Sequence, residues 1–235
     1  MKVIFIVPFR NAKQNLDTLI NSLTSQTNDS WECHFVDDMS DDESEKWFLN
    51  SIYHSSKKFT YHRNSKRMHA LFNIVKLSRT FEDHEDKIIA VIDGDDSLCN
   101  DKTVDYLIES YNKGNEVVWT SHKWDINGMN ISYDLPQNLD PYFLEWASSH
   151  LRTFKSSLLK NIKDENFKDL DGNWFKRGYD QALMLPLIKT CKSHEFIDKV
   201  CYKYNINSVS MPSREWAERD QLNTINLVRA RGFIK

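Results

Sequence analysis

The stretch IIAVIDGDDSLCND, residues 88–101, decides the fold of this chain. It begins with five apolar residues, which have the length and composition of a buried strand, and the run stops abruptly at Asp93. Three carboxylates, Asp93, Asp95 and Asp96, follow within four positions. Carboxylates are rarely buried without a partner, so the cluster predicts a strand that ends at a ligand site and holds a cation there. The simpler alternative is that Asp95 and Asp96 only cap the next helix.

The flanking sequence alternates between strand and helix patterns. Short apolar runs typical of strands occupy residues 2–7, 31–36, 59–63, 88–92 and 116–124. Helical patterns lie between them at residues 11–23, 40–53, 66–79 and 103–112, with Asn11 as the expected N-cap of the first. This order predicts an α/β fold with a doubly wound, mainly parallel sheet flanked by helices. A length of 235 residues with 40% hydrophobic content fits a single domain.

The carboxyl ends of the predicted strands carry polar residues. Residues 8–11 follow the first strand, Asp37 and Asp38 end the second, and residues 93–96 end the strand at 88–92. Ligands bind beyond the carboxyl ends of the strands in doubly wound sheets. We therefore expect these three segments to open onto one crevice.

Composition excludes several classes of function. The net charge of -3 gives no broad basic face for nucleic acid, and no apolar run is long enough to span a membrane. The scarcity of glycine, 6 residues, fits the absence of a P-loop or dinucleotide fingerprint. The four cysteines form no metal spacing, and the apolar N-terminal run is only as long as a strand. Free thiols and no leader predict a reducing, cytoplasmic location.

Asp93 and Asp95 flank Gly94, a residue that lets the backbone turn so that both side chains face one side. Carboxylate oxygens suit Mg²⁺ or Mn²⁺, and Mg²⁺ is usually held by one or two carboxylates together with substrate phosphates. The pattern predicts a divalent metal site at this strand end.

Three segments together resemble the family 2 glycosyltransferases of GT-A fold. They are VIFIVPFRNAKQNLDTLINSLTSQT (3–27), WECHFVDDMSDDES (31–44) and IIAVIDGDDSL (88–98). The likeness is looser through residues 150–162 and 175–187. It implies one GT-A-like domain over residues 1–235, with a nucleotide-sugar-binding half at 1–100 and an acceptor-binding half at 101–235.

The resemblance assigns roles at the donor site. Backbone around Pro8, Phe9 and Arg10 and the side chain of Asp38 would hold the base of a nucleotide diphosphate sugar. A carboxylate there accepts the uracil ring N–H, which favours UDP over purine donors.

The resemblance also implies the metal ligands and the base. Asp93 would meet the ribose or the metal, and Asp95 would ligate the Mn²⁺ or Mg²⁺ that bridges the two phosphates. Asp180 would be the general base, although it lies in GYDQAL rather than the family's frequent acidic pair. Asp180 as a helix N-cap is the structural alternative.

These residues predict a metal-dependent, inverting glycosyltransferase that moves a sugar from a UDP-sugar to an acceptor hydroxyl. The metal and nearby cations, among them Arg63, Lys66 and Arg67, would stabilise charge on the leaving diphosphate. A carboxylate base would take the acceptor proton. One alternative is a binding domain that keeps the fold without turnover. The other is a nucleotidyltransferase, which VPFRNAKQN disfavours because it contains no glycine.

Overall fold

The computed structural model describes residues 1–51, 56–206 and 214–235. The strands are β1 (Lys2–Phe9), β2 (Trp31–Asp37), β3 (Phe59–Arg63), β4 (Lys87–Val91), β5 (Ser97–Leu98), β6 (Val117–Trp124), β7 (Arg152–Lys155) and β8 (His194–Tyr204). The α-helices are α1 (Lys13–Thr24), α2 (Ser44–Asn50), α3 (Ala70–Arg79), α4 (Thr103–Asn112), α5 (Tyr179–Thr190) and α6 (Arg214–Arg231). Three 3₁₀ turns, at Pro141–Phe143, Ser156–Asn161 and Asp164–Phe167, complete the fold.

The strands form one sheet in the order β3-β2-β1-β4-β7-β6-β8-β5. The first four are parallel, β7 is antiparallel to both of its neighbours, and β8 is parallel to β6. The predicted mainly parallel α/β sheet is confirmed. The sequence patterns predicted neither β7 nor β8, which supply its second half.

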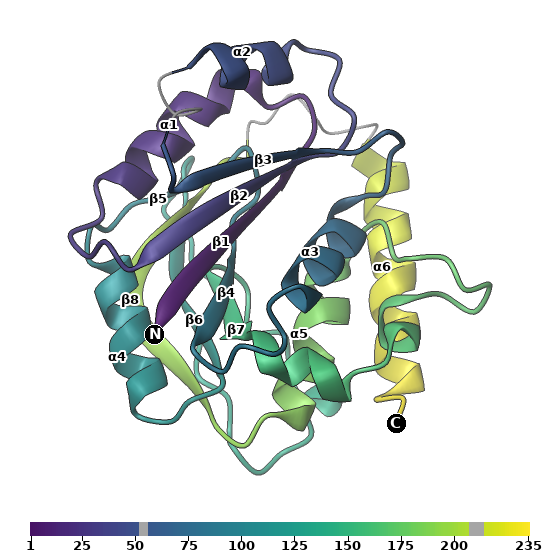
Figure 1. Ribbon diagram of the computed structural model, residues 1–235. Helices are drawn as coiled ribbons and strands as arrows, with labels where there is room; N and C mark the ends of the chain where they lie inside the picture. The colour runs from purple at the N-terminus through teal and green to yellow at the C-terminus, as the bar shows by residue number, and fades with distance from the viewer. Residues whose placement is uncertain (52–55, 207–213) are drawn as a thin grey trace.

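Helices cover both faces of the sheet (Figure 1). Val3, Phe5 and Val7 of β1 belong to the apolar cluster that contains residues of α1 and α4. Ile4 and Ile6 belong to the cluster that contains residues of α3 and α5. Burial on both faces explains why β1 and β4 are continuous apolar runs rather than alternating ones.

The far edge of the sheet curls back toward α1. The backbone N–H of Leu98 in β5 donates to Ser22 Oγ at 3.1 Å, and Gln26 Nε2 donates to the carbonyl of Asn100 at 2.8 Å. The segment after β4 is therefore tied both to β8 and to α1. This double attachment fixes the position of the residues that directly follow β4.

The expected helix cap at Asn11 is wrong, and so is the alternative that Asp95 and Asp96 cap a helix. Asn11 does not cap α1, because its side chain exchanges two hydrogen bonds with Asp41, at 2.6 and 2.9 Å. Asp95 and Asp96 do not cap a helix either, because α4 begins only at Thr103. The expected helix at residues 40–53 is shorter, Ser44–Asn50, and residues 52–53 lie outside the described part of the chain.

None of the described helices is both long and apolar enough to cross a membrane.

Gly94 makes the closest approach between β1 and the segment after β4. A Cβ atom on Gly94 would lie 2.2 Å from the Cβ of Phe9, which is buried. Phe9 follows Pro8 at the carboxyl end of β1, so only a residue without a side chain lets the two strand ends meet.

Gly94→Ala should lower the free energy of unfolding by at least about 3 kcal/mol, because the new methyl group overlaps buried atoms of Phe9 that cannot move away cheaply. Gly172→Ala is the control. It adds a methyl in open space at a φ of +81°, and should cost about 1–2 kcal/mol from backbone strain alone. Urea titration of both variants measures the difference, and equal costs would contradict the steric account.

Candidate active site

A cavity of about 480 Å³ opens at the carboxyl ends of β1, β2 and β4. Seven of the eight residues predicted for the site line it: Pro8, Phe9, Arg10, Asp38, Arg67, Asp93 and Asp95. The expectation that these segments share one crevice is confirmed. Asp180 is not among the lining residues.

Asp38 directly follows β2, and its side chain is buried against the loop that precedes α3. Its Oδ1 accepts hydrogen bonds from Asn64 Nδ2 at 2.8 Å, from the Met68 N–H at 2.7 Å and from Asn73 Nδ2 at 3.2 Å. Its Oδ2 accepts one, from the His69 N–H at 2.9 Å. Burial alone would raise the pKa of Asp38, but these donors outweigh it and lower the pKa below its usual value. The carboxylate thus holds the loop before α3, and Oδ2 keeps capacity for one more donor.

Asp38→Asn should lower stability near neutral pH by about 1–3 kcal/mol, because the amide cannot satisfy the same set of donors. Ionised Asp38 stabilises the fold above its unfolded pKa of 3.8, and this contribution is lost as the pH falls through the lower folded value. The deficit of the variant should therefore narrow as the pH drops below 4. Urea titrations at about pH 7 and about pH 3, with Asp17→Asn on exposed α1 as control, measure it. A deficit that is constant with pH would refute the ionised role.

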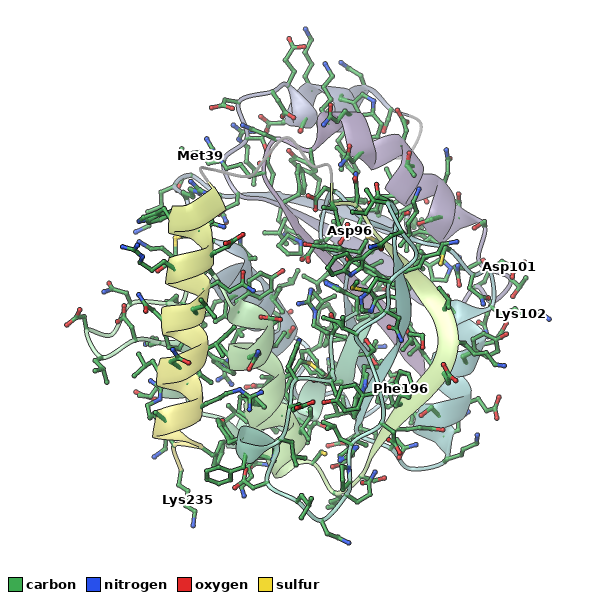
Figure 2. The ribbon with its side chains drawn as sticks, turned by 180° about the vertical axis from the view of Figure 1, so that it is seen from behind. Met39, Asp96, Asp101, Lys102, Phe196 and Lys235 are labelled. Carbon is green, nitrogen blue, oxygen red and sulfur yellow. The ribbon has the colours of Figure 1, made fainter. Side chains whose placement is uncertain are left out.

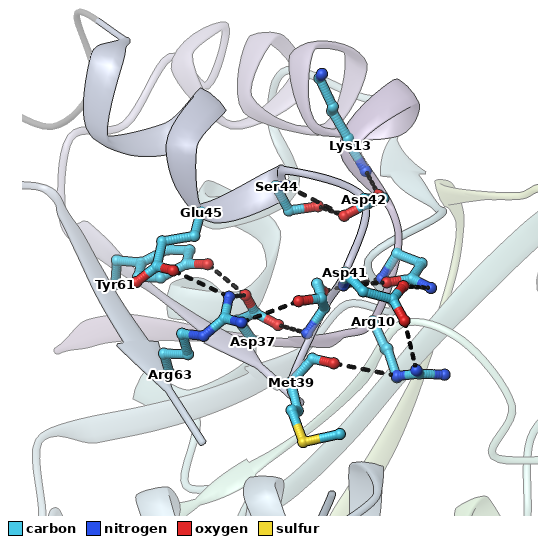
Figure 3. Close-up of polar contacts among 12 residues, drawn as sticks. Arg10, Lys13, Asp37, Met39, Asp41, Asp42, Ser44, Glu45, Tyr61 and Arg63 are labelled. Carbon is cyan, nitrogen blue, oxygen red and sulfur yellow. Dashed lines mark hydrogen bonds and ion pairs between the residues drawn. The ribbon is translucent and has the colours of Figure 1, made fainter. Parts of the chain in front are cut away.

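The loop after β2 is fixed by ion pairs and hydrogen bonds around Asp37 (Figure 3). The Asp37 carboxylate is fully buried and accepts from Tyr61 Oη, from Arg63 Nη1 at 2.9 Å and from the Ser40 N–H at 2.7 Å. Arg63 also pairs with Glu45 at 3.2 Å. Arg63 is therefore a structural cation here, and of the three cations expected near the diphosphate only Arg67 lines the cavity.

Arg10 connects the ends of β1 and β2 (Figure 3). Its guanidinium donates to the Met39 carbonyl and to Asp41 Oδ2, both at 3.3 Å. These contacts hold the backbone that follows Pro8 at the edge of the cavity. They thereby orient part of the cavity wall.

The carboxylate of Asp93 is held from two sides. Tyr179 Oη donates to its Oδ1, and Arg152 Nη2 donates to its Oδ2 at 3.1 Å. The guanidinium of Arg152 lies 5.3 Å from the centre of the Tyr179 ring. Arg152 is almost completely buried, at 2% exposure, so its charge must be compensated within the protein. The sequence patterns did not predict this role for Arg152, although a single arginine within the short segment LRTF (151–154) could have indicated a buried charge.

Asp96 lies in the interior rather than in the cavity (Figure 2). It accepts hydrogen bonds from Tyr202 Oη at 2.6 Å and from the Asn205 N–H at 2.7 Å. Burial, followed by the charges of Asp93 and Asp95, raises the pKa of Asp96 well above its usual range. A cation placed beside it would reverse this shift.

A potential metal-binding group combines Asp93, Asp96 and His150, whose ligand atoms lie within 4.8 Å of one another. The His150 ring stacks on Tyr202 with a centroid distance of 4.6 Å, and burial lowers its pKa well below the usual value. Its Nδ1 is buried and has no hydrogen-bond partner among the described residues. A neutral imidazole with a free nitrogen and two carboxylates form a donor set that suits a divalent ion.

Asp180 lies in the first turn of α5, and Gly178 occupies the cap position before that helix. The N-cap alternative for Asp180 is therefore wrong. Burial raises the pKa of Asp180, and the positive charge of Arg152 opposes this increase. Asp180 is half-buried, and Arg152 acts electrostatically on both Asp180 and Asp93.

The two last arginines of α6 are structural. Arg229 donates to Gln181 Oε1 at 2.7 Å and to the carbonyls of Tyr142 and Leu144. Arg231 donates to the carbonyls of Lys168 and Asn166. Both therefore fasten α6 to the second half of the chain.

Comparisons with known proteins agree with this geometry. The family model described as Glycosyl transferase family 2 matches residues 4–184. No curated protein matches the chain. S. aureus TarS 1-349 in complex with UDP superposes with a TM-score of 0.69 at 16% identity, covering 98% of this chain and 65% of that chain. S. aureus TarS 1-349 in complex with UDP-GlcNAc superposes with a TM-score of 0.66 at 17% identity, covering 100% of this chain and 68% of that chain.

A mannosyltransferase from Pyrobaculum calidifontis, PcManGT in complex with GDP-Man and Mn²⁺, gives a TM-score of 0.64 at 16% identity, covering 98% of this chain and 63% of that chain. The chain spans about two thirds of these structures, and 37% of another TarS structure. The likeness shows a shared GT-A fold. The match over residues 4–184 covers most of the sequence, so the chain belongs to glycosyl transferase family 2.

Proposed function

We propose that this protein is an inverting glycosyltransferase that moves a sugar from a UDP-sugar to the hydroxyl of an acceptor, with residues 1–100 binding the donor and residues 101–235 the acceptor. The observation that carries the proposal is the cavity at the carboxyl ends of β1, β2 and β4, lined by Asp38, Asp93 and Asp95. Family membership and the nucleotide-sugar complexes of TarS support it.

The donor base is proposed to lie between the backbone after Pro8 and the carboxylate of Asp38. Oδ2 of Asp38 has a single protein donor, so it can accept the N–H of a uracil ring. The fixed loops after β1 and β2 provide a preorganised wall, which reduces the entropy lost on binding.

A divalent ion, Mn²⁺ or Mg²⁺, would be held at the end of β4. Asp93 belongs to two possible sets of metal ligands. In one set it acts with Asp95, and both residues line the cavity. In the other set it acts with the buried residues Asp96 and His150. The bound ion would supply Lewis-acid stabilisation of charge on the diphosphate. Arg152 and Tyr179 hold Asp93 in a single orientation.

Asp180 is proposed as the general base. The acceptor oxygen forms a bond to the anomeric carbon as the bond from that carbon to the diphosphate oxygen breaks. The electron pair leaves with UDP, and the acceptor proton passes to the Asp180 carboxylate. A single displacement of this kind inverts the anomeric centre. The raised pKa of Asp180 suits a group that must accept a proton near neutral pH.

Asp95→Asn should reduce kcat/KM at least about 100-fold and weaken Mn²⁺-dependent UDP binding, because the amide keeps the shape but loses the charge that attracts the ion. Asp101→Asn is the control, since Asp101 is exposed on the turn before α4, outside the cavity (Figure 2). Calorimetry with UDP, with and without Mn²⁺, measures the binding. If Asp96→Asn abolishes metal binding and Asp95→Asn does not, the interior set with His150 holds the ion. Activity that survives a chelator would refute metal dependence.

Asp180→Asn should lower kcat about 10²–10⁴-fold and leave UDP-sugar affinity near normal, because a general base acts on the acceptor proton and not on donor binding. The wild-type rate should fall with decreasing pH at a value above the usual range of aspartate, since burial raises the pKa of Asp180 and protonation disables the base. The pH profile of the variant should lack this limb. Full activity of the variant would move the role to Glu145 or Asp171, which are the next residues to test.

The alternative of a non-catalytic sugar-binding domain makes a different prediction. A domain of this kind would bind UDP-sugars, but it would release no UDP when Mn²⁺ and a panel of acceptors are added. UDP release above background, lost in Asp180→Asn, separates the two functions.

A further inference from the structure

Three cations that line the donor cavity have no carboxylate partner among the side chains that the structure describes. Arg67 precedes α3, and Lys176 and Arg177 precede α5. No ion pair joins any of them to a carboxylate among the side chains of residues 1–51, 56–206 and 216–235. Four other arginines each pair with a carboxylate: Arg10, Arg63, Arg79 and Arg152.

The three cations act on the same part of the cavity. His69 lines the cavity with them, and after burial their positive charges lower the pKa of that imidazole, while the charge of Asp38 opposes them. The backbone N–H of His69 donates to Asp38. The positive field of the three cations therefore lies beside the proposed binding site of the nucleotide base. Free positive charge in a cavity of about 480 Å³ indicates an anionic ligand.

Arg177 is oriented by an aromatic side chain of α6. Its guanidinium lies 5.6 Å from the centre of the Trp216 ring, which lines the cavity and is 59% exposed. The next residue, Gly178, has a φ of +59°, and a Cβ there would lie 2.9 Å from the carbonyl oxygen of Gln221. The backbone of the segment that carries Lys176 and Arg177 thus packs against α6 at the wall of the cavity.

We propose that Lys176 and Arg177, together with Arg67, bind the diphosphate of the nucleotide donor, with Trp216 positioning Arg177. This inference rests on the proposed function and extends it to residues outside the acidic strand end. Guanidinium and ammonium groups form charge-assisted hydrogen bonds with phosphate oxygens. They become more favourable as the bond to the sugar breaks and negative charge grows on the leaving UDP.

The test compares UDP with uridine, which lacks the diphosphate. Lys176→Met and Arg177→Met keep the apolar stems and remove the charges. Each should weaken UDP binding about 10-fold in calorimetry and change uridine binding less than about 2-fold. Arg177→Lys should retain most of the preference for UDP, because it keeps the charge. Lys160→Met, at an exposed residue paired with Asp83, should bind both ligands as the wild type does.

Emission from Trp216 gives a second readout. UDP should change the fluorescence of the wild type by an amount that is reduced in both Arg177→Met and Trp216→Phe. Each variant is first checked for a wild-type melting temperature, which exposed or half-buried positions should preserve.

Each of the following outcomes would overturn the inference. Equal losses for UDP and uridine would place the cations at the nucleoside. Unchanged UDP affinity, with a raised KM for the acceptor only, would assign them to an anionic acceptor. A wild type that binds neither ligand would refute the proposed function as well, whereas normal UDP binding by both Met variants refutes this inference alone.

Discussion

The site depends on the ion pair between Asp93 and Arg152, at the place where strand pairing in the sheet changes from parallel to antiparallel. Asp93 follows the last strand of the parallel half, and its counter-charge, Arg152, comes from β7, the antiparallel strand beside it. An arginine at 2% exposure would be unfavourable without a counter-charge, and the partly exposed carboxylate of Asp93 supplies one. Tyr179 completes the arrangement and brings α5, with Asp180, to the same point. The first part of the chain, up to β4, is thereby linked to the later part by this ion pair as well as by the pairing of β4 with β7.

The donor half could be predicted from local sequence because its signals are local. A buried strand followed at once by carboxylates identifies Asp38, Asp93 and Asp95 without any knowledge of long-range contacts. The helix caps were harder to predict. The side chains of Asn11 and Asp96 form hydrogen bonds with partners that lie 30 or more positions away in the sequence. Competition from tertiary hydrogen bonds decided these positions, not intrinsic capping preference.

The second half was predicted poorly for a physical reason. In β8, HEFIDKVCYKY mixes charged and apolar residues because only part of its length is buried, so the periodicity of a strand is masked. Arg152, His150 and Tyr202 then converge on the acidic strand end from segments more than 50 residues downstream, a proximity that no spacing rule encodes. Asp180 was predicted through family resemblance alone and stays a prediction, whereas Lys176 and Arg177 were proposed because they line the cavity and lack carboxylate partners among the described side chains.

The contact of Gly178 with α6 has a consequence for how this protein is handled in the laboratory. Helix α6 is part of the cavity through Trp216 and Asp220, and Arg229 and Arg231 tie its far end to the rest of the molecule. Shortening the C-terminus, or fusing a bulky partner to Lys235, would therefore disturb the wall of the cavity. Purification tags belong at the other end, where Met1 is exposed and β1 begins away from the cavity.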